Sequence, residues 1–166
     1  MTEQPTTISS PEGSGRAATP RLEQARQERK GVRAAFDRLE RAAASPASER
    51  TAEWCDAFTG RLRELRAAFA HHVELTEADD GLFAEIVATA PRLTHRTDEL
   101  RHDHRDIEDA LDRAEAQLGG VGLPDPKAIV HARDAAVELM GRISRHRHLG
   151  AELVYDAYNV DIEAAD

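Results

Sequence analysis

The sequence has a single cysteine and no long apolar run, and each shortage excludes a class of protein. Cys55 has no second cysteine to pair with, which excludes an internal disulfide and a site built from several thiolates. No apolar segment approaches the roughly 20 residues that a membrane span requires, and the polar N-terminal segment lacks the apolar centre of a signal peptide. We therefore expect a cytoplasmic protein in which any metal site uses histidine and carboxylate ligands.

Clusters of basic residues along the chain are also missing. The formal net charge is -9 over 166 residues. A surface of this sign repels a phosphate backbone or an anionic lipid headgroup rather than attracting it. We expect neither nucleic acid nor a membrane as a partner.

The residues that are present favour helices. Apolar residues make up 40% of the chain and charged residues 32%, while only 4% are aromatic, and the abundant Ala, Leu, Arg and Glu are good helix formers. Four prolines stand where helices can begin, in the pairs Thr19-Pro20, Ser45-Pro46, Ala90-Pro91 and Asp125-Pro126. In all of these pairs except Ala90-Pro91, the residue before the proline is a good N-terminal cap. This pattern predicts helices over about 20–43, 46–76, 91–118 and 126–158, with a short extra helix near 82–89.

Long amphipathic helices with short connections are typical of an all-α, up-down-up-down four-helix bundle. We expect this bundle to occupy residues 19–160. Residues 1–18 are small and polar with no apolar period, which predicts a disordered tail because too little apolar surface is available to offset the ordering entropy. Residues 161–166 form an acidic C-terminal end, and 119–124 read as a loop.

Each predicted helix carries one apolar stripe with alternating spacings of three and four, and histidines interrupt three of the stripes. Those histidines are His72, His104 and His146, each on a different helix. The other five fall off the stripes: His71, His95, His102, His131 and His148. Three inward imidazoles could converge on one metal ion. They could equally be core residues satisfied by hydrogen bonds, and the stripes alone leave both possibilities open.

Three segments, HHVELTEADDGLFAEI, PRLTHRTDELRHDH and RHRHLGAELVYDAY, resemble the hemerythrin-like, or HHE cation-binding, domains. Within that family the chain is similar to actinobacterial forms with an acidic-Gly-Leu-Phe turn after the second helix. The resemblance covers about residues 20–158. It implies a four-helix bundle around a non-haem di-iron centre, with histidines from all four helices and bridging carboxylates. It also implies iron as cofactor and a role in binding or sensing oxygen, nitric oxide or peroxide, or in handling iron.

The resemblance matches His72, His104 and His146 to the family histidines of the second, third and fourth helices. The chain departs from the family pattern at three other positions. Arg29 stands where the first helix would supply a histidine, and an arginine cannot ligate a cation. Thr76 and Gly150 stand where carboxylates would follow His72 and His146.

Two further carboxylates could complete a degenerate ligand set. Glu77 is one residue beyond the usual spacing from His72, and we predict it as a metal ligand together with the three stripe histidines. His148 and Glu152 have the regular spacing but lie off the stripe, so they would join the site only if the last helix rotates. The alternatives left open are a single metal ion with a free position for water or a diatomic ligand, and a di-iron centre.

A rival hypothesis comes from a different class of protein. In it the chain is a metal-free interaction protein of the same fold, with structural core histidines and a salt bridge between Arg29 and Glu77. No arrangement for nucleophilic catalysis or phosphate binding is present, so we predict no catalytic residues. The sequence leaves enzymatic turnover as the weakest of the three hypotheses.

Overall fold

The computed structural model describes residues 19–47, 50–118 and 126–159, and every regular element in these ranges is a helix. The helices are α1 (Pro20–Ala44), α2 (Thr51–Glu77), α3 (Leu82–Thr89), α4 (Thr94–Ala116) and α5 (Pro126–Asn159), and a short 3-10 turn, η1 (Pro91–Leu93), precedes α4. Among the described helices, none combines the length and the apolar character that crossing a membrane requires. The predicted tail, the loop at 119–124 and the acidic end lie outside the described residues.

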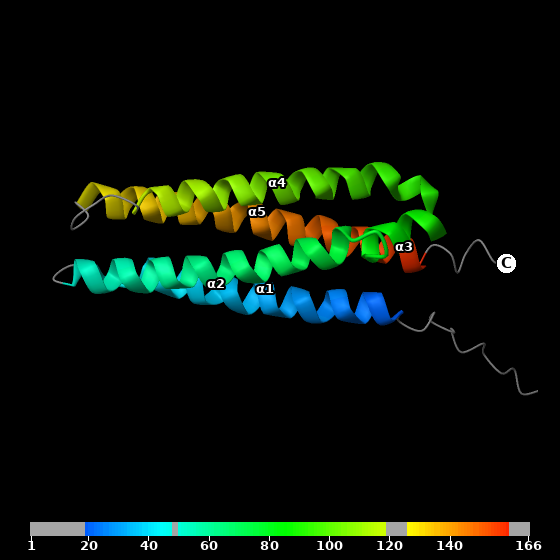
Figure 1. The fold of residues 1–166 in the computed structure, drawn as a ribbon. Helices are drawn as coiled ribbons and strands as arrows, with labels where there is room; N and C mark the ends of the chain where they lie inside the picture. The colour runs from blue at the N-terminus through cyan, green and yellow to red at the C-terminus, as the bar shows by residue number, and fades with distance from the viewer. Residues whose placement is uncertain (1–18, 48–49, 119–125, 160–166) are drawn as a thin grey trace, which may run out of the picture.

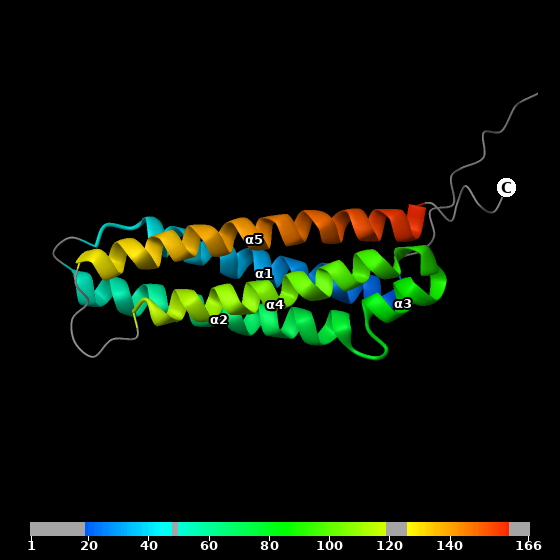
Figure 2. The ribbon, with the colours of Figure 1, turned by 90° about the horizontal axis from the view of Figure 1, so that it is seen from above.

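The four long helices form the predicted up-down-up-down bundle (Figure 1). The packing of α1 against α2 and of α4 against α5 is extensive, whereas α1 meets α5 and α2 meets α4 more sparsely. The bundle therefore consists of two helical hairpins packed against each other. The short helix α3 covers one end of the bundle, where α2 ends and α4 begins (Figures 1 and 2).

The predicted apolar stripes form the core. Their aliphatic and aromatic members are almost completely buried, and they make two clusters, one along most of the bundle and one at the α3 end. The boundary between the clusters falls at one level of the bundle: Phe69 and Ile143 belong to the first, and Leu100 and Leu153 to the second. The stripe histidines lie at this level, so they divide an otherwise apolar interior.

The first helix begins as predicted and the second does not. Thr19 caps α1, because its hydroxyl oxygen accepts a hydrogen bond from the backbone N–H of Leu22 at 3.1 Å. The prediction that the second helix begins at Pro46 is wrong, since α2 begins at Thr51. Ser45 ends α1 instead of starting α2: its hydroxyl donates to the carbonyl oxygen of Ala42 at 2.7 Å.

A tight turn between α2 and α3 fixes where α2 ends. A Cβ atom on Gly81 would lie 2.7 to 2.9 Å from the carbonyl oxygens of Leu75, Thr76 and Ala78, so any side chain there clashes with backbone. The φ angle of Gly81 is -74°, an ordinary value, and the requirement is therefore one of space alone. This turn brings α3 back over the end of the bundle.

We predict that Gly81→Ala lowers the free energy of unfolding by about 1 to 3 kcal/mol, because the backbone of the turn must move to admit the methyl group. Urea unfolding followed by circular dichroism measures the effect. The matched control is Gly60→Ala, at an exposed position within α2 where a Cβ meets nothing within 4 Å. That change should raise stability by about 0.5 to 1 kcal/mol through helix propensity. Equal effects of the two substitutions would contradict the steric argument.

Candidate metal centre

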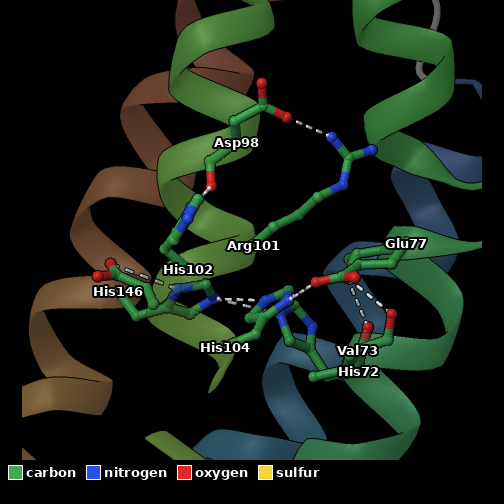
Figure 3. A network of polar contacts seen from close by, with 10 residues as sticks. His72, Val73, Glu77, Asp98, Arg101, His102, His104 and His146 are labelled. Carbon is green, nitrogen blue, oxygen red and sulfur yellow. Dashed lines mark hydrogen bonds and ion pairs between the residues drawn. The ribbon is translucent and has the colours of Figure 1, made fainter. Parts of the chain in front are cut away.

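Three histidine side chains from three helices meet between the two hairpins (Figure 3). The Nε2 atom of His146 lies 3.2 Å from Nε2 of His104 and 3.4 Å from Nε2 of His72. One ring nitrogen from each residue lies within 4.8 Å of the other two. All three side chains are buried, with exposed fractions of 8% for His72, 1% for His104 and 5% for His146.

Local sequence explains the inward direction of these rings. His72 follows Phe69 on the buried face of α2, and His104 and His146 continue the stripes of α4 and α5. Phe69 packs against all three imidazoles, with ring centroids 5.6 to 6.1 Å apart. Phe83 of α3 stacks on His104 at 5.7 Å. The apolar rings hold the imidazoles in place without competing for their nitrogens.

The second nitrogen of each imidazole points away from the shared point. Nδ1 of His104 is 2.5 Å from Oε1 of Glu77 (Figure 3). Nδ1 of His146 is 3.8 Å from Oδ2 of Asp103, and both of these buried atoms lack a hydrogen-bond partner. Nδ1 of His72 is also buried without a partner. An ionised Glu77 accepts a hydrogen bond from Nδ1–H of His104, and in this tautomer the Nε2 lone pair faces the other histidines.

Burial keeps the three imidazoles neutral. The pKa of each is lowered from 6.5 to about 3, first by burial and then by repulsion from a neighbouring histidine. The Arg29 guanidinium lowers the pKa of His72 and His146 further. At neutral pH the site therefore presents neutral imidazoles, which is the form that ligates metals.

Two carboxylates stand behind the histidines, and only one was singled out from the sequence. Burial raises the pKa of the Glu77 carboxyl against the opposing charges of Arg101 and Arg105. Burial likewise raises the pKa of Asp103, with Arg145 opposing it. Asp103 was missed because it lies beside the α4 stripe rather than on it, and its position one residue before His104 was the only signal available.

The predicted metal residues divide into three groups. His72, His104 and His146 converge, and Glu77 contacts this cluster from outside, on the nitrogen of His104 that faces away from the shared point. The structure does not bring His148 or Glu152 to the cluster. They pair with each other at 3.2 Å on the surface of α5, where their side chains are 74% and 48% exposed.

The residues that depart from the family pattern surround the cluster without replacing the missing ligands. The hydroxyl of Thr76 donates to the carbonyl oxygen of His72 at 2.8 Å. The expected salt bridge between Arg29 and Glu77 is not formed. Nε of Arg29 instead donates to the carbonyl oxygen of Ala25 at 3.3 Å, while Glu77 is engaged by His104.

A small cavity adjoins the histidines on the side of α1 and α5. It holds about 30 Å³, enough for a water molecule or a diatomic molecule. Its walls include the side chains of Arg29, Phe69, His72, Thr76 and His146, together with Gly150. A side chain on Gly150 would meet nothing within 4 Å, so the glycine contributes to this open space.

The donor set fits one metal ion. Three neutral imidazoles direct Nε2 atoms at one point, and soft or borderline transition metals accept such ligands. Two buried Nδ1 atoms without partners, on His72 and His146, are consistent with imidazoles whose protons are on Nδ1 and whose Nε2 lone pairs are free for a metal. Within the described ranges, no carboxylate joins the histidines in the cluster that could hold an ion.

A protein-family model described as Hemerythrin HHE cation binding domain matches residues 21–157. The match spans all the helices that carry the cluster. Comparisons with curated proteins and with solved structures found no match.

We predict that the metal-free chain loses stability as the pH falls from 6.5 towards 3. The three histidines have a folded pKa of about 3, whereas they bind protons near pH 6.5 when unfolded, so acid favours the unfolded state. The free energy of unfolding is therefore unaffected by protonation of these histidines above pH 6.5. Below that pH it falls by about 1.4 kcal/mol per pH unit for each histidine. Urea unfolding at about pH 7, 6 and 5, with a chelator present, measures this fall in the free energy of unfolding.

The raised pKa values of Glu77 and Asp103 have the opposite effect, because these carboxyls bind protons more readily in the folded chain as the pH falls. The contribution of the histidines is therefore measured by comparing variants. His146→Gln should remove about a third of the contribution that the three histidines make to the dependence of the unfolding free energy on pH. His131→Gln, at an exposed position on the same helix, should leave it unchanged. Identical pH dependence in the His146→Gln variant and the unmodified chain would show that the buried imidazoles are not its origin.

Proposed function

Because the chain belongs to the hemerythrin HHE cation-binding domain family, we propose that His72, His104 and His146 bind a metal ion and that this ion is non-haem iron. The observation that carries the proposal is the convergence of three Nε2 atoms in an apolar core. Burying three imidazoles at one level is costly unless their nitrogens are satisfied. A divalent ion at the shared point would satisfy all three at once.

We propose one ion per chain. A second ion needs further ligands, and the first-helix position that would supply a histidine holds Arg29, whose charge opposes a second cation. The positions that would supply bridging carboxylates hold Thr76 and Gly150. Thr76 already donates its hydroxyl proton to a backbone carbonyl. These features support a single ion over a di-iron centre.

Glu77 and Asp103 would act from behind the ligands. A carboxylate on the non-ligating nitrogen of a histidine fixes the tautomer and raises the basicity of the ligating nitrogen. Glu77 is placed to do this for His104, and Asp103 lies beside His146. Their two negative charges also offset the charge of a divalent ion without occupying a coordination position.

Three protein ligands leave coordination positions open towards the small cavity. Iron with such positions supplies reversible binding of, or electron transfer to, a diatomic molecule or peroxide. The cavity excludes larger molecules, since it holds about 30 Å³. We therefore propose binding or sensing of oxygen, nitric oxide or peroxide as the role of the iron, with iron handling as the second candidate.

The rival function is a metal-free interaction protein. The Nε2 separations of 3.2 and 3.4 Å lie within hydrogen-bonding range, so His146 could bridge the other two rings with no ion present. Nδ1 of His72 and of His146 lack a hydrogen-bond partner in either arrangement, so these two atoms do not distinguish the two functions. The measurement of bound metal separates the two functions.

We predict that the purified chain, loaded anaerobically with ferrous iron and passed through a desalting column, retains close to one iron per chain. His104→Gln removes the ligand while keeping a polar side chain, and should abolish retention. His102→Gln is the matched control, because His102 is exposed on the same helix. Retention by fewer than about a tenth of the chains, unchanged in His104→Gln, would exclude iron as the bound ion and, if zinc is not retained either, favour the rival.

We predict that Glu77→Gln keeps the stoichiometry of bound metal but weakens its affinity about 10- to 100-fold, because His104 loses a charged acceptor. Competition with a coloured chelator measures the affinity. Glu74→Gln, at an exposed position on the same helix, is the control and should leave the affinity unchanged. An unaltered affinity in Glu77→Gln would show that this carboxylate neither ligates the metal nor supports a ligand.

A further inference from the structure

A groove on the bundle surface runs between α1 and α5 and meets the histidine cavity at its inner side. These two helices are neighbours in the bundle (Figure 2). Arg29 of α1 and Arg147 of α5 line both the groove and the cavity. The groove holds about 620 Å³, much more than the cavity behind it. The side chains of both arginines therefore lie between the solvent-exposed groove and the histidine cavity.

The groove collects positive charge in a chain that is strongly negative overall. Besides the two arginines, its walls include Lys30, Arg33, Ser144 and His148, with Asp37 as the only carboxylate among them. Asp37 is already paired with Arg33 at 2.8 Å. The sequence shows no basic block here because the cationic residues come from helices more than 100 positions apart.

Arg29, Lys30 and Arg147 are not neutralised within the part of the chain that the structure describes. No carboxylate in those ranges lies within ion-pairing distance of any of the three. Nε of Arg29 donates one hydrogen bond to a backbone carbonyl, which leaves the paired terminal nitrogens of its guanidinium free.

The lack of an ion-pairing carboxylate is costly for Arg29 because of where its side chain lies. Its side chain is half-buried, and burial lowers its pKa, as do the neighbouring charges of Arg26 and Arg147. A guanidinium nevertheless stays charged under all ordinary conditions. Like charges beside an apolar cavity repel strongly, because the effective dielectric constant is low there. An anion between Arg29 and Arg147 would remove this repulsion.

We propose that Arg29 and Arg147 bind a small inorganic oxyanion where the groove opens onto the histidine cavity. The planar fork of a guanidinium matches two oxygens of such an ion, and charge-assisted bonds of this kind are strong. Lys30 adds a third positive charge in the same groove. This site goes beyond the iron function, because it requires no metal; a bound cation would strengthen it through the added positive charge.

The test uses the metal-free chain at constant ionic strength, with chloride replaced stepwise by inorganic phosphate in one series and by nitrite in another. Both the midpoint of thermal unfolding and the heat of binding are measured. The midpoint of thermal unfolding of the unmodified chain should rise with added oxyanion, and the heat of binding should show saturation. Arg147→Gln should weaken binding at least about tenfold, since one of two charge-assisted contacts is lost.

Arg29→Gln gives a second and sharper readout. In chloride its unfolding midpoint should exceed that of the unmodified chain, because the substitution removes a half-buried, uncompensated charge. With added oxyanion its midpoint should stay constant, so the difference between the two chains narrows. Arg63→Gln, at an exposed position on α2, is the matched control and should respond to oxyanion as the unmodified chain does.

The shape of the ion is read from the two series. Binding of phosphate without nitrite places a tetrahedral ion in the groove, and binding of nitrite without phosphate places a small ion at the cavity; either supports the proposal. Equal responses of the unmodified chain and Arg147→Gln, or no response to either ion, would overturn it. Because no metal is present, this failure leaves the iron proposal standing, and failure of iron binding leaves the oxyanion site standing.

Discussion

The burial of three neutral imidazoles at one level of an apolar core is the constraint on which the rest of the molecule depends. Each ring presents two nitrogens, and a buried nitrogen without a partner costs free energy. The helices direct the three Nε2 atoms at one point and leave the Nδ1 atoms to the surroundings. Only His104 has a close partner for Nδ1, the carboxylate of Glu77. The point shared by the three Nε2 atoms is therefore where the proposed metal ion would bind.

The end of α2 transmits this constraint to the fold. Gly81 permits a turn so close that any side chain would strike three carbonyl oxygens. The turn ends α2 at Glu77 and returns the chain as α3, whose Phe83 stacks on His104. One side of His104 is thus held by a carboxylate and the other by an aromatic ring. Loss of the turn would disturb both supports together, which links a backbone detail to the geometry of the cluster.

Sequence reasoning succeeded where spacing decides the answer and failed where distant residues decide it. His72, His104 and His146 could be selected because each continues an apolar series of three and four, and the helix faces followed from the same rule. The start of α2 was misplaced because Ser45 is suitable both as a cap for a following helix and as the end of a preceding one. In the fold, Arg133, which is 88 positions away, donates a hydrogen bond to the carbonyl oxygen of Ser45 at 2.7 Å and so holds Ser45 at the end of α1.

The role of Glu77 and the cationic groove depend on tertiary structure in the same way. Spacing brings Glu77 near His72, but only the packing of α2 against α4 shows that its closest contact is Nδ1 of His104. The groove could not be predicted at all, since Arg29 and Arg147 are brought together by the pairing of α1 with α5. Arg29 reads in the sequence as a lost ligand, whereas in the fold it lines the same groove and cavity as a second arginine, Arg147.

The distribution of charge around the cluster bears on what can approach it. Three neutral imidazoles do not reduce the charge of a divalent ion, and the two carboxylates behind them are partly offset by Arg101, Arg105 and Arg145. The approach from the α1–α5 groove is lined by further positive charges, including Arg29. A site of this kind attracts anions over neutral molecules of the same size, because the low dielectric of the cavity magnifies the difference. Arg29 therefore adds to the positive electrostatic character of this entrance.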